Sequence, residues 1–200
     1  MLVMNSRLIG TPILSIQIGA PIGRITGSIL DPHTLKIVAF RLEGPLIKEN
    51  NLLDVKSIRE YSNYGMVIDD IDELVTDSDI VRIQEVLKLN FKLIGLKVET
   101  KKGSKLGKVS DYSVTSEDFL TKQIVVKRPI VKSLNDPELI ISRQEIVEIT
   151  DYKVIVKDEE KTIKARANKE DFVPNFVNPF RSQKPDFVPA DTKTPDDKDS

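Results

Sequence analysis

Short runs of alternating apolar and polar residues fill most of the first 158 positions of the chain. β-Branched residues are frequent in these runs, and Gly, Pro, Asn and Asp separate them, which is the pattern of short β-strands. The runs are IGTPILSI, IGRITGSIL, LKIVAFRL, LLDVKSIREY and YGMVID, followed by LIGLKVET, LGKVSDYSV, KQIVVKR, ELIISRQEIVEI and YKVIVKD. Several short strands in so few residues favour a small barrel or curled sheet, because closure removes exposed strand edges.

The two groups of strands repeat one another. From Gly23 to Lys48 a constant offset of 84 aligns the halves without a gap, and it places Gly107 opposite Gly23. An Ile-Gly pair near the N-terminus recurs 85 positions later, and after an insertion near SLNDPE the offset becomes 88. We therefore expect two copies of one small domain, the first repeat (residues 1–76) and the second repeat (residues 90–158).

The segment between the repeats has a different period. In TDSDIVRIQEVLKLN, four apolar side chains recur on one helical face, and Asp77 and Ser78 are both suitable N-caps. Lys88 lies near the negative end of the helix dipole. The pattern predicts a linker helix over about residues 77–89.

The C-terminal segment, residues 159–200, is rich in charge and then in proline. Apolar residues are too sparse there to offset the entropy of ordering, so we expect a disordered tail. The tail nevertheless contains DFVP twice, and two further phenylalanines lie between the copies. It is either a spacer, or a strand on its own barrel, or a pair of linear motifs that bind a partner's apolar groove. In the last case the contact residues are Phe172, Val173, Pro174, Phe176, Phe180, Phe187, Val188 and Pro189.

Charge distinguishes the repeats. The whole chain has a formal net charge of -1, which indicates no bulk attraction to nucleic acid or acidic lipid. The second repeat is more cationic, and Lys101, Lys102, Lys105 and Lys108 gather around one of its turns. These lysines are either a solvated hairpin tip or a surface that contacts RNA or an acidic protein.

Candidate catalytic chemistry is scarce. The chain has no cysteine and a single histidine, His33, in a proline-containing turn. GSKLGKV fails as a phosphate-binding loop, because only three residues separate its glycines, Lys108 is followed by Val109, and a strand follows instead of a helix. We therefore expect no enzymatic activity, no cofactor and no metal.

The hydropathy of the chain bears on membrane insertion and on its location in the cell. No apolar run reaches the roughly 18 residues of a transmembrane helix, and the N-terminus lacks the pattern of a signal peptide. We expect no membrane insertion and a cytoplasmic location.

The repeated motifs resemble those of the PRC-barrel family. They are GAPIGRITGSILDPHTLKIVAFRL at 19–42 and LLDVKSIREY at 52–61, then GSKLGKVSDYSV at 103–114, KQIVVKR at 122–128 and LIISRQEIVEI at 139–149. The resemblance covers roughly residues 5–158, once per repeat, although SEDFLTKQ replaces the DPHTLK turn in the second repeat. Members of this family are small β-barrels that act as interaction modules, including in the photosynthetic reaction-centre H subunit and in a ribosome maturation factor.

The resemblance implies a mainly β chain with two tandem PRC-barrel-like domains, to which the patterns above add a short connecting helix and a disordered C-terminal tail. It also implies a non-catalytic adaptor that binds protein partners. The alternative is an RNA- or ribosome-associated assembly factor that uses the lysine-rich turn of the second repeat.

Overall fold

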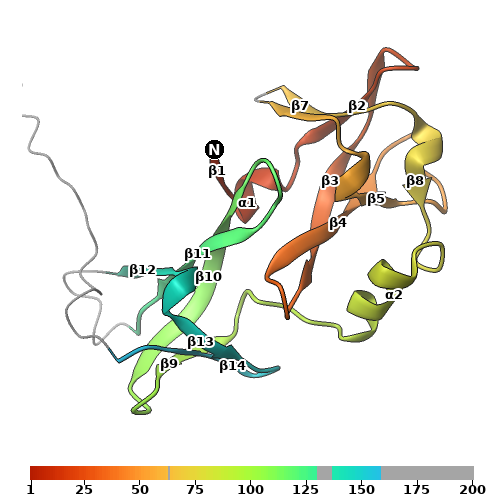
Figure 1. The fold of residues 1–200 in the computed structure, drawn as a ribbon. Helices are drawn as coiled ribbons and strands as arrows, with labels where there is room; N and C mark the ends of the chain where they lie inside the picture. Colours follow the sequence, from red (N-terminus) through yellow and green to blue (C-terminus); the bar gives the residue numbers. More distant parts are fainter. Residues whose placement is uncertain (63, 130–136, 159–200) are drawn as a thin grey trace, which may run out of the picture. The chain divides into compact units, whose positions relative to one another are not determined.

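The computed structural model describes residues 1–62, 64–129 and 137–158, which belong to one compact unit. The described chain is mainly β and forms two seven-stranded sheets (Figure 1). Every segment predicted as strand contains at least one strand, which confirms the mainly β prediction. The predicted tail, residues 159–200, lies outside the described residues.

The first sheet has the strand order β6-β7-β2-β3-β4-β5-β8. Its strands are β2 (Pro12–Ser15), β3 (Ala20–Asp31), β4 (Lys36–Glu43), β5 (Leu52–Asp54), β6 (Glu60–Ser62), β7 (Gly65–Ile68) and β8 (Leu74–Val75).

The second sheet has the order β12-β11-β10-β9-β14-β13, and β1 also pairs with β10. Its strands are β1 (Leu2–Met4), β9 (Lys97–Thr100), β10 (Lys105–Thr115), β11 (Thr121–Lys127), β12 (Glu138–Ser142), β13 (Ile146–Ile149) and β14 (Lys153–Val156). The α-helices are α1 (Asn5–Leu8) and α2 (Val81–Lys88), and 3₁₀ turns lie at Val55–Ser57, Ile71–Glu73 and Arg143–Glu145.

The two sheets share one pairing scheme. β2 is parallel to β7 and antiparallel to β3, and β9 is likewise parallel to β14 and antiparallel to β10. The register shifts between Ile25 and Gly27 in β3, and between Val109 and Asp111 in β10, at positions related by the offset of 84. The sequence repeat therefore extends to backbone pairing and to its irregularities, so these bulges are a shared feature of the two repeats rather than random defects.

Neither sheet closes into a barrel within the described residues. Closure needs the two end strands to pair, but β6 and β8 remain ends of the first sheet, and β12 and β13 remain ends of the second. The end strands are short, from two residues in β8 to five in β12. Short end strands limit edge-to-edge association without closure.

The linker helix begins later than the predicted residue 77. The carboxylate of Asp79 accepts a hydrogen bond from the backbone N–H of Thr76 at 2.6 Å, which closes a separate turn before α2. This hydrogen bonding lowers the pKa of Asp79. Ile83 of α2 is buried against Ile29, Val38, Ala39 and Leu52 of the first sheet.

The repeats meet through reciprocal backbone hydrogen bonds. The N–H of Ile37 donates to the carbonyl of Phe119 at 3.0 Å, and the N–H of Thr121 donates to the carbonyl of Leu35 at 2.9 Å. The offset of 84 relates Ile37 to Thr121 and Leu35 to Phe119, so the two bonds are one contact made from both sides. A two-fold symmetric dimer makes its contacts in this way.

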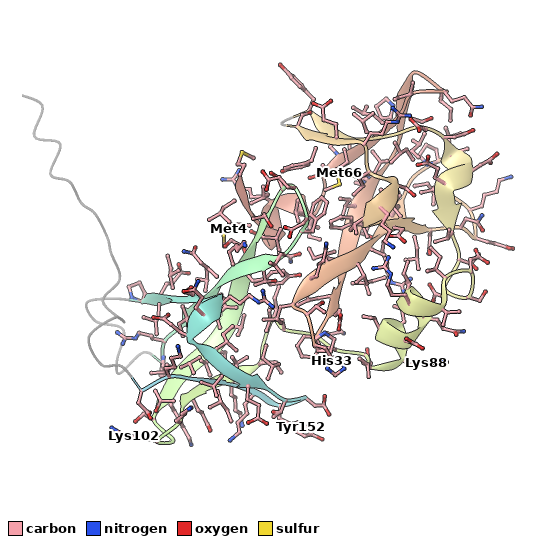
Figure 2. All side chains as sticks on the ribbon, in the orientation of Figure 1. Met4, His33, Met66, Lys88, Lys102 and Tyr152 are labelled. Carbon is pink, nitrogen blue, oxygen red and sulfur yellow. The ribbon has the colours of Figure 1, made fainter. Side chains whose placement is uncertain are left out.

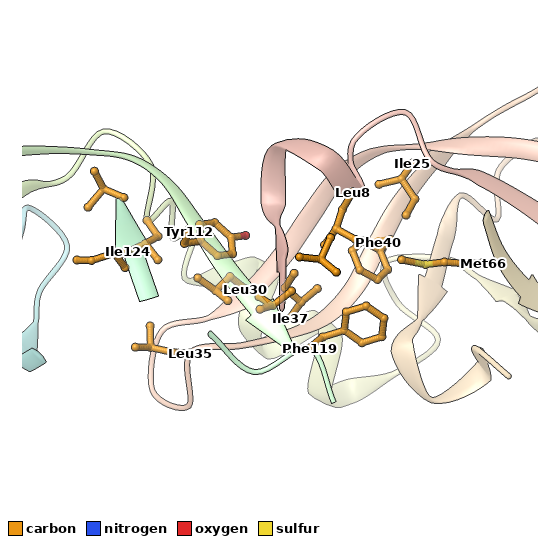
Figure 3. Packing of buried hydrophobic residues seen from close by; sticks show 14 of the residues in the cluster. Leu8, Ile25, Leu30, Leu35, Ile37, Phe40, Met66, Tyr112, Phe119 and Ile124 are labelled. Atoms are coloured by element: carbon orange, nitrogen blue, oxygen red, sulfur yellow. The ribbon is translucent and has the colours of Figure 1, made fainter. Parts of the chain in front are cut away.

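Apolar side chains from both repeats continue this contact into one core. Leu8, Ile37 and Phe40 of the first repeat belong to the same buried cluster as Phe119 and residues of the second sheet (Figure 3). The rings of Phe40 and Phe119 meet edge to face, with centroids 5.3 Å apart. Leu35 and Phe119 both have left-handed φ values, 56° and 53°, which the surrounding contacts must hold in place.

A partly buried chain of hydrogen-bonded polar side chains crosses the same boundary. The hydroxyl of Ser28 donates to Asn5 Oδ1 at 2.7 Å and lies 2.9 Å from the hydroxyl of Tyr112. Because the only hydroxyl proton of Ser28 is used by Asn5, Tyr112 is the donor in the second bond. Ser28 and Tyr112 are also related by the offset of 84. Burial raises the pKa of Tyr112 to about 12.

Tyr112→Phe tests this polar chain. The loss of one hydrogen bond should lower the free energy of unfolding by about 1 kcal/mol at neutral pH. The wild type should lose up to about 3 kcal/mol more as pH rises from 10 to about 12, because only the unfolded chain then releases the phenol proton. The Phe variant should lack this alkaline component in urea unfolding at several pH values. An identical alkaline loss in both proteins would contradict the assignment.

Candidate functional site

The lysine-rich turn is the hairpin loop between β9 and β10. Thr100 and Ser104 flank a three-residue loop in which Gly103 has a left-handed φ of 83° and donates its N–H to the Thr100 carbonyl at 2.9 Å. Lys101 and Lys102 occupy the other two loop positions, and both are exposed. Figure 2 labels Lys102 at the tip. Their backbone N–H groups bind the carbonyl of Val156 and the carboxylate of Asp158, which anchors the tip.

Gly107 lies within β10, so GSKLGKV is not a phosphate-binding loop. A Cβ at Gly107 would overlap the carbonyl oxygen of Lys127 on the neighbouring strand. The equivalent glycine of the first repeat, Gly23, has the same constraint, since a Cβ there would lie 2.6 Å from the carbonyl oxygen of Glu43. Close approach of two strands therefore explains why both repeats carry this glycine.

Four lysines form a row across the second sheet. Lys97 of β9 is the register partner of both Lys153 of β14 and Lys108 of β10, and Lys108 is in turn the register partner of Lys127 of β11. Residues directly opposite one another on neighbouring strands project from the same face. We call Lys153, Lys97, Lys108 and Lys127 the lysine row.

A groove of about 560 Å³ is bordered by this part of the sheet, and its lining includes residues from both faces, because Val98 and Gly107 adjoin Lys97 and Lys108 in sequence and successive side chains of a strand point to opposite faces. Five of its lining residues are cations and Glu99 is the only acid among those described; Glu99 binds the ammonium group of Lys153 at 3.1 Å. We call it the cationic groove, lined by Lys97, Val98, Glu99, Lys105, Gly107, Lys108, Lys127, Arg128 and Pro129.

The equivalent surface of the first repeat has different chemistry. The positions of the lysine row are there occupied by Gly65, Pro12, Arg24 and Glu43, and Arg24 lies opposite Glu43 in the register. A Cβ at Gly23 would also meet the end of the Ile47 side chain, so Ile47 packs directly over this glycine. The cationic groove therefore belongs to the second repeat alone.

The structure places the four predicted lysines in two groups. Lys105 and Lys108 line the cationic groove, whereas Lys101 and Lys102 lie at the hairpin tip beside it. The predicted tail residues, Phe172, Val173, Pro174, Phe176, Phe180, Phe187, Val188 and Pro189, lie outside the described residues.

Sequence reasoning missed three members of the row, Lys97, Lys127 and Lys153, together with Arg128. The repeat offset contained a signal for them, because aligning each cation with its uncharged or acidic counterpart in the first repeat marks it as specific to the second.

The other candidate residues do not form a catalytic or metal-binding cluster within the described part of the chain. His33 lies exposed in the turn between β3 and β4, where its N–H donates to Asp31 at 3.0 Å (Figure 2). Within residues 1–62, 64–129 and 137–158, no group of three or more acidic, histidine or cysteine side chains is placed to hold a metal ion. None of the described helices is long and apolar enough to span a membrane.

Comparison with protein-family models gives no match to this chain, and comparison with curated proteins gives none either.

Substitution of the two glycines tests the close approach of the strands. Gly107→Ala should lower the free energy of unfolding by about 2–3 kcal/mol, because its φ is 154° and its Cβ would overlap the Lys127 carbonyl. Gly103→Ala meets open space at a φ of 83° and should cost only about 1 kcal/mol. Urea unfolding of both variants measures the difference. Equal losses of unfolding free energy in the two variants would contradict the steric explanation, because they would show that only the backbone conformation requires glycine at position 107.

Proposed function

We propose that this chain is a non-catalytic protein-interaction module that binds an acidic surface of a partner through its second repeat. The observation that carries the proposal is the lysine row. Lys153 of the row is already paired with Glu99, whereas Lys97, Lys108 and Lys127 are exposed. Like charges directly opposite one another destabilise a sheet, so these three lysines gain most when an anion binds between them. A chain with a net charge of -1 that concentrates cations on one face is suited to selective electrostatic recognition.

The proposed architecture is a pair of PRC-barrel-like repeats that act as an adaptor. The shared pairing scheme of the sheets and the repeated glycine motifs support this relationship. In this proposal the DFVP segments of the tail add a second weak contact with the partner and raise avidity. Glu99, the only acid among the described lining residues of the groove, is paired with Lys153, which favours binding over catalysis. The module would act in the cytoplasm.

Binding of two anionic polymers by the full-length chain tests the proposal. Polyglutamate represents an acidic protein, and polyuridylate represents the RNA of the alternative function. Reversal of Lys101, Lys102, Lys105 and Lys108 to Glu should weaken polyglutamate binding at least about tenfold at low salt. Reversal of four exposed lysines elsewhere, Lys48, Lys56, Lys88 and Lys92, changes the net charge equally and should have a much smaller effect.

Two results would contradict the proposal. Equal losses in the two variants would show that net charge, and not the second repeat, attracts the polymer. Tighter binding of polyuridylate than of polyglutamate, with a steep dependence on salt, would instead support an RNA- or ribosome-associated assembly factor.

A further inference from the structure

β12 is an end strand within the described part of the chain, whereas its equivalent in the first repeat, β5, pairs on both sides. β5 lies between β4 and β8, and β12 pairs with β11. Leu52 of β5 is the register partner of Arg41. Ile140 of β12 is likewise the partner of Val125, and offsets of 88 and 84 relate the two pairs. The described part of the second sheet therefore lacks a counterpart of β8.

This difference coincides with an exposed aliphatic side chain on β12. Leu52 is 0% exposed, because Val75 of β8 is its register partner and Ile83 of α2 packs in the same cluster. Ile140 occupies the equivalent position in the second repeat and is 54% exposed. Burial of apolar surface is favourable, so a strand that brings an aliphatic side chain beside Ile140 stabilises the sheet.

The described chain follows the path of the first repeat up to the end of β14. The backbone N–H of Lys101 donates to the carbonyl of Val156 at 3.0 Å. The equivalent N–H of the first repeat, that of Ile16, donates to the carbonyl of Ile68 at the same distance. Five residues then connect β7 to β8. Five residues after Val156 lead to Thr162, so the chain has the length needed to return to the edge of β12.

The sequence at this point is suited to a short strand. Thr162 and Ile163 are the equivalents of β8 by the offset of 88, and both are β-branched. Ile163 is the only large apolar residue among positions 157–171. It is therefore the residue of this stretch that can cover Ile140.

We propose that Thr162 and Ile163 add a strand to the free edge of β12, with Ile163 as the register partner of Ile140. Strand addition pairs backbone groups at the edge and covers the exposed isoleucine. β8 shows that two residues suffice for such a strand in this fold. Seven residues, 164–170, then connect the sheet to the first DFVP segment. The tail is thereby anchored to the sheet that carries the lysine row.

Disulfide formation in the full-length chain tests the pairing, because the protein has no cysteine of its own. Ile140→Cys/Ile163→Cys places two thiols on directly opposite residues, whose separation suits a disulfide. In Ile140→Cys/Lys164→Cys the second thiol projects from the opposite face of the strand. In a glutathione redox buffer, the first variant should form its intramolecular disulfide at least about tenfold faster than the second.

A second measurement uses a single thiol at the edge of β12. In Ile140→Cys, Ile163 covers the thiol, and the added change Ile163→Asn should raise the rate of iodoacetamide labelling at least about fivefold. Ala167→Asn makes a matched neutral change beyond the proposed strand and should leave the labelling rate unchanged.

Three results would overturn the assignment. Disulfide formation that is equally fast or faster with Lys164→Cys would show that Ile163 is not the register partner of Ile140. Equal labelling rates with and without Ile163→Asn would show that this residue does not cover the edge. Disulfide-linked dimers in place of monomers would show that a second copy of the chain supplies the strand.

Discussion

The reciprocal contact between the repeats is the constraint on which the rest of the structure depends. Leu35 and Phe119 present their carbonyls to Thr121 and Ile37 from left-handed turns, and this places Lys36 opposite Leu120 as an antiparallel bridge. Because the contact is made by equivalent residues, each repeat supplies one N–H donor and one carbonyl acceptor to the other. Apolar side chains of both repeats share one core at this boundary, and the hydroxyl of Tyr112 is hydrogen-bonded to Ser28 across it. The repeats therefore form one unit rather than two independent domains on a linker.

The two repeats share a backbone pairing scheme, but their surfaces differ in chemistry. The first repeat covers its outer face with α2 and packs Ile47 over Gly23. At three of the four positions equivalent to those under α2, the second repeat has polar residues, Ser113, Lys122 and Gln123. The fourth equivalent, Ile140, is exposed, and the second repeat carries the lysine row. In the proposed function, both repeats maintain the fold and only the second repeat binds the partner. Strand register, which a rigid shared core preserves, then fixes the spacing of the cations.

Local patterns predicted the strands, because apolar alternation shows within a few residues. The constant offset that relates Gly23 to Gly107 predicted the repeat. β1 and β8 were missed, since three and two residues carry no measurable period. The predicted start of the helix, residue 77, was wrong, because the carboxylate of Asp79 accepts a hydrogen bond from the backbone N–H of Thr76. Such a local hydrogen bond forms a turn in place of a helix cap. Of the lysine row, only Lys108 was predicted from the sequence, because the row depends on the register of strands that are distant in sequence.

Native-state hydrogen exchange tests the pairing of the repeats most directly. The amides of Ile37 and Thr121 make the contact between repeats, and those of Ile25 and Val109 make bonds within each repeat. If the repeats form one cooperative unit, all four amides should exchange only through global unfolding, with the same opening free energy and the same dependence on denaturant. Exchange of Ile37 and Thr121 at a clearly lower free energy, or different opening free energies for Ile25 and Val109, would contradict the account.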